Sequence, residues 1–291
     1  MESVKKYSIL YIVVIIAALI SCGKGRNTPP VGSNTGGDNN KDTNCVIATI
    51  SQVNSGAGAE FSLSASYNSN YEVTKLTVYD SVHKTKNFEA AFSYTTADSV
   101  RIDQYQYMLL DGSRRVSRFI TKSDMTNPAH ADDYVFEYTY NSDGYLAAKD
   151  LFINGSTRAN FSTLYSYNNK QLTGCIMTSP SAGNLKVLES SLAYDNSVII
   201  KNWIYTFPDA MEGYTYLTLL NFGKHVANPL KKVVTNIYDP ATGKLLDTWT
   251  TNYANYIINA NGYMLSGQAT GDWQQGIASF YGKTNFYYAC H

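Results

Sequence analysis

The residues best suited to catalysis or metal binding are scattered along this chain. The histidines are His83, His130, His225 and His291. None forms the short His-x-x-x-His or His-Glu-x-x-His spacing that binds zinc. No serine lies in a Gly-x-Ser-x-Gly elbow, and no glycine-rich phosphate loop occurs. We therefore predict no catalytic residue, no metal site and no cofactor, and we expect the histidines to be structural or exposed to solvent.

One short acidic stretch contains oxygen ligands that calcium could use. Asn141, Asp143 and Gly144 lie within four consecutive residues. A calcium loop needs several such ligands at fixed spacing, whereas Asn-Ser-Asp-Gly is also a common turn sequence. The sequence favours the turn over the metal site.

The four cysteines suggest two different roles, attachment of lipid at the N-terminus and formation of a disulfide. Cys22 follows an apolar N-terminal run and is considered with it below. Cys45 and Cys290 lie at the two ends of the predicted folded domain, and an oxidising compartment would allow them to pair. Cys175 would then remain as a buried thiol. An odd number of cysteines after Cys22 leaves open the alternative that all three are free.

Aromatic residues are the most informative functional feature. Rings at alternate positions, such as those from Tyr134 to Tyr140, could form a stacking surface for sugar rings or fill the core of a curved sheet. The alternation favours the core. Trp203, Trp249 and Trp273 could join a stacking surface, and Trp273, in a loop between Gly271 and Gly276, is the best candidate for an exposed contact.

Composition narrows the function classes. The chain has 291 residues, with 23 basic and 23 acidic side chains, so its formal net charge is zero. No charge excess favours binding to nucleic acid. Charged residues are only 16% of the chain while tyrosines number 25, and tyrosine suits half-buried strands. The sequence is typical of an all-β protein.

The N-terminus carries an export signal. Residues 1–22 comprise a start with Lys5 and Lys6, an apolar run, and Leu-Ile-Ser-Cys ending at Cys22, which resembles a bacterial lipobox. The resemblance implies acylation (palmitate) of Cys22 and anchoring in the outer membrane. Residues 23–44 are rich in Gly and Asn and predict a flexible tether. In lipoproteins that this N-terminus resembles, acidic residues after the lipidated Cys favour export to the cell surface, so the resemblance and the lack of such residues after Cys22 imply the periplasmic face.

The pattern of residues 45–291 predicts a single antiparallel β domain. In the stretch 134–153, apolar and polar residues alternate with a period of two, then a turn with Gly144 reverses the chain. Asn259 to Tyr263 repeats that turn. We expect a long meander of hairpins that forms a curved sheet or partly closed barrel, with at most one or two short helices around 207–226. One predicted hairpin pairs 186–194 with 198–205.

The recurring unit is a Tyr-x-Tyr strand end, a polar turn with Gly, and a return strand. It occurs at 138–146, and in degenerate form at 165–172, 238–245 and 259–265. With the lipobox and the linker, it resembles uncharacterised Bacteroidetes lipoproteins described as having a porin-like fold, which are distantly similar to the tyrosine-aspartate repeats of Rhs proteins. The resemblance implies a curved or partly closed antiparallel sheet and no established activity.

Together these features predict a lipid-anchored cell-envelope protein that is not an enzyme. Its expected role is binding or scaffolding, with a glycan or another envelope protein as the partner. One alternative is a glycan-processing accessory hydrolase, whose carboxylates would lie roughly 5–10 Å apart in a cleft. A further alternative is an outer-membrane β-barrel. Against it stand the lipobox, the tether and the charged residues within strands, such as Glu137 and Lys231.

Overall fold

The computed structural model describes residues 45–53, 61–80, 85–125, 127–201, 219–272 and 282–290. They form seventeen strands and one 3₁₀ turn, η1 (Pro180–Ala182). No helix among these residues is long and apolar enough to cross a membrane. The strands are β1 (Cys45–Val53), β2 (Phe61–Tyr67), β3 (Val73–Asp80), β4 (Thr85–Ala91), β5 (Ser93–Thr96), β6 (Ser99–Arg101), β7 (Tyr107–Leu110), β8 (Val116–Lys122), β9 (Asp133–Tyr140), β10 (Leu146–Ile153), β11 (Phe161–Asn168), β12 (Gln171–Ser179), β13 (Leu185–Tyr194), β14 (Leu230–Tyr238), β15 (Leu245–Ile258), β16 (Met264–Gly271) and β17 (Gly282–Cys290).

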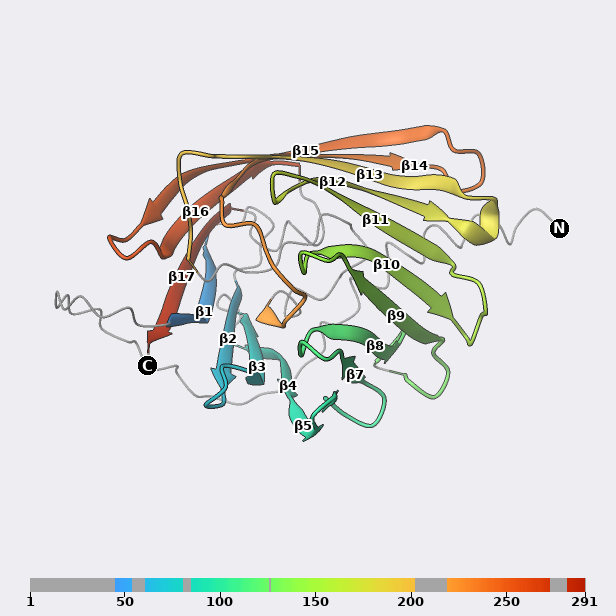
Figure 1. The fold of residues 1–291 in the computed structure, drawn as a ribbon, viewed down its shortest axis with the longest axis horizontal. Helices are drawn as coiled ribbons and strands as arrows, with labels where there is room; N and C mark the ends of the chain where they lie inside the picture. The colour runs from blue at the N-terminus through green and yellow to red at the C-terminus, as the bar shows by residue number, and fades with distance from the viewer. Residues whose placement is uncertain are drawn as a thin grey trace.

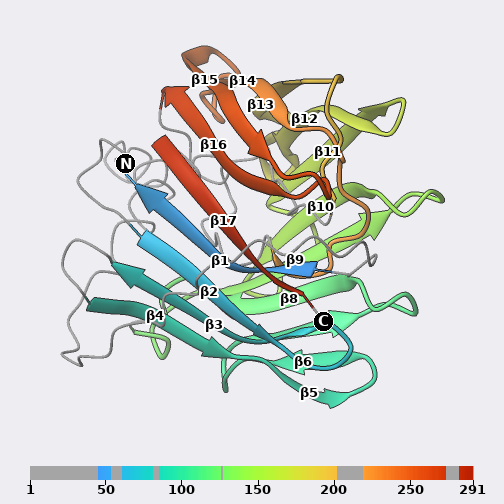
Figure 2. The same cartoon turned by 90° about the vertical axis from the view of Figure 1, so that its left-hand side faces the viewer.

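The strands form one antiparallel sheet that curves round on itself. Successive strands pair along the chain from β1 to β4 and from β5 to β17. Strands β4 and β5 follow one another with only Phe92 between them. Strand β1 pairs with β2 on one side and with β17 on the other, so the first and last strands meet (Figures 1 and 2). The predicted all-β antiparallel meander, expected as a curved sheet or partly closed barrel, is confirmed as one curved sheet.

Side chains alternate between a buried inner face and an outer face that carries charges. On β8 and β9, Phe119 lies opposite Phe136 in the sheet register, and their rings stack with centroids 6.1 Å apart. At the next position Arg118 lies opposite Glu137, and these two form an ion pair on the outer face. This period of two is what a sheet with one buried face requires. The aromatic row on β9 therefore belongs to the core, with Phe136 only 3% exposed.

A segment between β13 and β14 lies inside the ring of strands. We call residues 219–229 the inner segment; it is drawn in orange within the ring in Figure 1. Phe222 is fully buried and packs edge-on against Tyr138, with centroids 4.9 Å apart. The amide of Val116 donates to the carbonyl of Asn221 (2.9 Å), which fixes the segment to the start of β8.

The predicted hairpin between 186–194 and 198–205 is wrong in the part that the structure describes. Residues 198–201 form no strand, and residues 202–205 lie outside the described ranges. Strand β13 pairs with β14 instead. The chain leaves the sheet because other partners satisfy its backbone: the amide of Ile200 donates to the carbonyl of Ala227 (2.6 Å), and that of Lys201 to the carbonyl of Gly262 (2.8 Å).

Several hairpin turns share one hydrogen-bond pattern. In each, the side-chain oxygen of the first residue, Asn or Asp, accepts the amides of the third and fifth residues. The fourth residue has a positive φ between 60° and 89°, where glycine is the least strained. This fourth residue is glycine in 141–145 and 259–263, two turns that the sequence predicted. The turns with this pattern are 68–72, 111–115, 141–145 and 259–263.

The oxygen of Asn141 is thus used by the backbone of its own turn. In the described ranges, no group of three or more ligating side chains is placed to hold a metal ion.

Half-buried tyrosines link strands at their ends. The hydroxyls of Tyr67, Tyr94, Tyr140 and Tyr256 each donate to a backbone carbonyl near the start of another strand. The bond from Tyr140 to the carbonyl of Val116 is 2.6 Å long. Burial raises the pKa of Tyr94 to about 12 and raises the pKa values of the other three further. These phenols therefore stay neutral and can donate throughout the physiological range.

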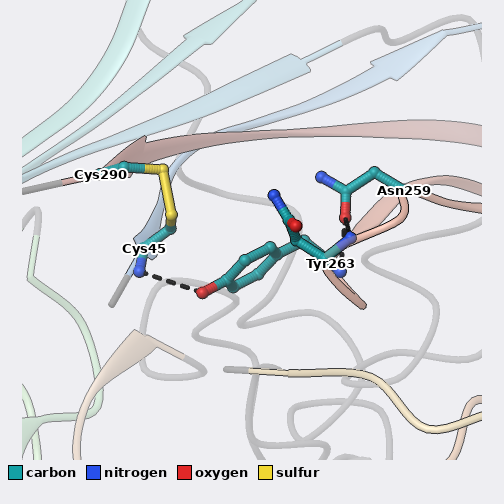
Figure 3. Close-up of a disulfide and its surroundings, with 5 residues drawn as sticks. Cys45, Asn259, Tyr263 and Cys290 are labelled. Carbon is teal, nitrogen blue, oxygen red and sulfur yellow. Dashed lines mark hydrogen bonds between the residues drawn. A yellow bond between two sulfur atoms is a disulfide. The ribbon is translucent and has the colours of Figure 1, made fainter. Parts of the chain in front are cut away.

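A disulfide joins the two ends of the domain. Cys45 of β1 and Cys290 of β17 lie opposite each other in the sheet register and are bonded (Figure 3). The amide of Cys45 donates to the hydroxyl of Tyr263 (3.3 Å), which connects this corner to the 259–263 turn. Cys175 is outside this disulfide and is buried, with 2% of its surface exposed. The covalent bond therefore closes the seam where the first strand meets the last.

Candidate functional site

The tryptophans proposed for ligand stacking do not come together in the described structure. Trp203 and Trp273 lie outside the described residues. Trp249 is half-buried on β15, and its indole N–H donates to Asp247 (2.8 Å). A surface that joins the three is therefore still a prediction.

The structure instead shows a cavity at the end of the ring where the inner segment lies. Its volume is about 540 Å³. Aliphatic side chains of β1, β3, β6, β7 and β8 form its walls, together with Leu219 and Leu220 of the inner segment. A volume in this range and a mainly apolar lining with a few polar groups are typical of small-ligand sites. We call it the first cavity.

An ion pair and an exposed ring lie at the polar side of the first cavity. Arg114 donates from Nε to Glu72 Oε1 (2.7 Å) and from Nη2 to the same oxygen. The other carboxylate oxygen of Glu72 accepts a hydrogen bond from the side-chain amide of Asn68 (2.9 Å). The Arg114 guanidinium also lies 5.6 Å from the centre of the Tyr94 ring. Beside them, Tyr71 lines the cavity while 40% of its surface is exposed.

A second, more open cavity of about 810 Å³ also adjoins the inner segment. Arg115 and Asp143 line it, together with Ser113 and Lys224. Arg115 forms an ion pair with Asp111 (2.6 Å) and stacks on Tyr140 at 4.2 Å from the ring centre. Burial acts to raise the pKa of Asp111, but hydrogen bonds from the Arg115 side chain and from the backbone amides of Arg115 and Ser113 outweigh it and lower that pKa. Arg115 is thus paired before any ligand arrives, and Lys224 and Asp143 add one charge of each sign.

Three residues of the inner segment line both cavities: Asn221, Gly223 and His225. The Asn221 side chain donates to the carbonyl of Arg114 (3.0 Å) and accepts the amide of Gly223 (3.1 Å). Burial lowers the pKa of His225, so its imidazole is neutral at physiological pH. In the part of the chain that the structure describes, its ring forms no hydrogen bond. His225 was expected to be structural or solvent-exposed, and the structure places it against two cavities.

Gly223 allows the inner segment to approach the 141–145 turn closely. Its φ is +83°, and a Cβ at this position would lie 2.5 Å from the carbonyl oxygen of Gly144. The same oxygen accepts the amide of Lys224 (2.9 Å). The inner segment is therefore fixed to two of the turns that form the site.

Comparisons with known proteins show the fold. No protein-family model and no curated protein matches the chain. Among solved structures, a porin-like protein from Bacteroides uniformis ATCC 8492 is similar, with TM-score 0.56, 14% identity and coverage of 84% of this chain and 96% of that one. A porin-like protein from Bacteroides vulgatus ATCC 8482 is similar with TM-score 0.52, 10% identity and coverage of 84% and 99%. At such low identity, these similarities establish that the chain has a porin-like fold, and its likeness to tyrosine-aspartate repeats stays a prediction.

Proposed function

We propose that this protein is a lipid-anchored protein of the bacterial outer membrane that binds a ligand at the end of its barrel. The first cavity is the observation that carries the proposal, because it combines apolar walls with an exposed ring and fixed polar groups. A glycan is the favoured ligand, and another envelope protein is the alternative. Trp273 remains a candidate contact from outside the described residues.

The N-terminal sequence supports the anchor. The lipobox places Cys22 where acyl chains are attached, and each buried CH₂ group contributes about 0.8 kcal/mol to membrane affinity. Several chains together would give a stable attachment. The fold neighbours from Bacteroides are named porin-like, which agrees with a cell-envelope setting. Residues 23–44 would hold the domain on the order of 25 Å from the membrane.

Hydrolysis of glycans is less well supported by the cavities. A glycosidase needs two carboxyl groups that face one bond at roughly 5–10 Å. Among the described lining residues, the first cavity has one carboxylate, Glu72, and the second has one, Asp143. Glu72 is held by Arg114 and Asn68, so its oxygens are occupied by structural hydrogen bonds. This arrangement favours binding over catalysis.

The outer face of the sheet favours contact with water over contact with lipid. Lys75 and Lys86 both pair with Glu89 at 3.1 Å, and Lys186 pairs with Glu189 at 3.0 Å. All five side chains are more than a third exposed. A strand that faces hydrocarbon carries apolar side chains on its outer face, and charges there are costly. We therefore favour the anchored domain over the outer-membrane barrel.

Two measurements test the proposal. Incorporation of labelled palmitate, lost in Cys22→Ser, tests the anchor; labelling that persists in the variant would contradict it. A glycan array probed with the full-length protein in detergent tests binding, with Tyr71→Ala and Trp273→Ala beside it. Tyr107→Ala is the matched control, since Tyr107 of β7 is also 40% exposed. Saturable binding that Tyr71→Ala weakens and Tyr107→Ala preserves is the expected result.

A further inference from the structure

We infer that the two cavities form one extended site for an uncharged oligosaccharide, bound along the inner segment. This inference rests on the proposed function and goes further by naming the charge and the length of the ligand. It follows from four observations: the cavities share residues, their charges are balanced, their polar groups both donate and accept, and the inner segment that lines them is fixed.

The shared residues place the two cavities next to each other. Asn221, Gly223 and His225 line both cavities, and the inferred ligand, longer than one sugar ring, extends from one to the other along this stretch. One ring would occupy the first cavity against Tyr71. The following units would pass His225 and reach the second cavity, where Lys224 and Ser142 lie.

The pairing of charges argues for an uncharged ligand. Glu72 neutralises Arg114, and Asp111 neutralises Arg115. Lys224 and Asp143 line the second cavity with opposite signs. A carboxylated or sulfated sugar gains most from cations that lack a partner, and a cationic ligand from unpaired carboxylates. The site has no excess of cations over carboxylates or of carboxylates over cations.

The polar groups fit hydroxyls. A sugar hydroxyl both donates and accepts, and neutral imidazole, amide and hydroxyl side chains do the same. His225 supplies the imidazole and Asn70 an amide at the first cavity, while Ser113 and Ser142 supply hydroxyls at the second. Tyr71 supplies a ring face for the apolar C–H side of a sugar. A purely apolar ligand would leave these polar groups without partners, which is costly when they are desolvated.

The site is formed before the ligand binds. The backbone bonds from Val116 to Asn221 and from Lys224 to Gly144, both 2.9 Å, fix the inner segment at its two sides. The two ion pairs hold the neighbouring turns. A rigid site loses less conformational entropy on binding, so a moderate number of hydrogen bonds to sugar hydroxyls can give a measurable affinity.

The test uses the full-length protein in detergent and an array of neutral, uronic-acid and sulfated oligosaccharides of graded length. We expect binding to neutral oligosaccharides, with affinity that rises from the monosaccharide to longer ligands. Calorimetry should show that Tyr71→Ala and His225→Phe each weaken binding about tenfold, the effect of losing one stacking or hydrogen-bonding contact. Tyr107→Ala and His130→Phe, at exposed positions outside both cavities, are the matched controls.

The other outcomes separate the two proposals. Binding confined to acidic glycans, or neutral binding that both Tyr71→Ala and His225→Phe leave intact, would overturn this inference while the binding function stands. The same holds if a monosaccharide binds as tightly as longer ligands. If no glycan of any class binds to protein that still unfolds cooperatively, the favoured glycan form of the proposed function falls together with the inference.

Discussion

Replacing Gly223 with alanine tests whether the inner segment is fixed to the turns of the barrel. Gly223 has a φ of +83°, and a Cβ there would lie 2.5 Å from the carbonyl oxygen of Gly144. A separation below 3.0 Å to a backbone atom requires that something moves. The bond from the Lys224 amide to the same oxygen is the first interaction that this movement would break.

The matched control is Gly155→Ala, in the turn between β10 and β11. Gly155 also has a positive φ, +68°, but a Cβ there would meet no atom within 4 Å. Both variants carry the left-handed backbone penalty of about 1–2 kcal/mol. Only Gly223→Ala adds the clash, the lost hydrogen bond at about 1 kcal/mol, and a poorer fit of buried Phe222. We expect a loss of unfolding free energy of about 1–2 kcal/mol for Gly155→Ala and about 3–4 kcal/mol for Gly223→Ala.

Urea unfolding followed by circular dichroism measures both values in one series. The excess of about 2 kcal/mol in Gly223→Ala corresponds to a further fall in Tm of about 4–8 °C for a domain of this size. Because Gly223 lines both cavities, Gly223→Ala should also lower the affinity for any ligand that binds there. Equal losses of stability in the two variants would refute the close approach between the inner segment and the 141–145 turn.

Other parts of the fold yield separate predictions. Tyr140→Phe should cost about 1–2 kcal/mol in urea unfolding, because the carbonyl of Val116 loses its hydroxyl donor; unchanged stability would exclude that role. Burial lowers the pKa of His225 in the folded protein, whereas the unfolded imidazole keeps its usual pKa of about 6.5. Below that pH the unfolded chain binds more protons than the folded one, so the free energy of unfolding should fall as the pH drops from 7 to 5. His225→Gln should reduce this pH dependence, and an unchanged slope would contradict the assignment. Reduction of the bond between Cys45 and Cys290, which closes a span of 245 residues, should cost about 5 kcal/mol in the chain-entropy model. Cys45→Ala with wild-type stability would show that the bond contributes little.

Local sequence signals predicted most of the strands, because each hairpin carries its own information. Alternation gives the buried face, and an Asn or Asp followed three residues later by glycine gives the turn. The turns at 141–145 and 259–263 follow this rule. The turns at 68–72 and 111–115 have the same hydrogen bonds but hold Tyr71 and Arg114 at the positive φ. Without glycine at that fourth position, their turn signal is weaker.

The pairing that failed was the one that local signals could not determine. Residues 198–205 alternate like a strand, yet the amides of Ile200 and Lys201 donate to Ala227 and Gly262, which are distant in the sequence. Such contacts depend on where the ring places its turns. The partner of β13 is β14, which begins 36 residues after β13 ends.

The candidate site was not predictable for the same reason. Arg114 and Asn221 are 107 residues apart, and their contact forms only when the inner segment enters the ring. His225 has no neighbouring ligand in sequence, so it gave no signal of a site. The aromatic rows were visible, but rings such as Phe136 and Tyr138 belong to the core. The informative feature in the sequence would have been the repeated turn, because three of these turns, 68–72, 111–115 and 141–145, line the cavities.

Turn chemistry links the fold to the site. The Asn68 side chain fixes the 68–72 turn through its oxygen, and through its nitrogen it holds Glu72. Glu72 in turn holds Arg114, the fourth residue of the 111–115 turn. That turn contacts the inner segment through Asn221. Each link is a polar group that a hairpin needs to reverse the chain, so the same residues that end the strands also position the charged and hydrogen-bonding groups around the first cavity. A barrel built from such turns obtains a rigid polar rim at one end without a separate scaffold, and changes at the turns should therefore affect binding more than changes on the outer face of the strands.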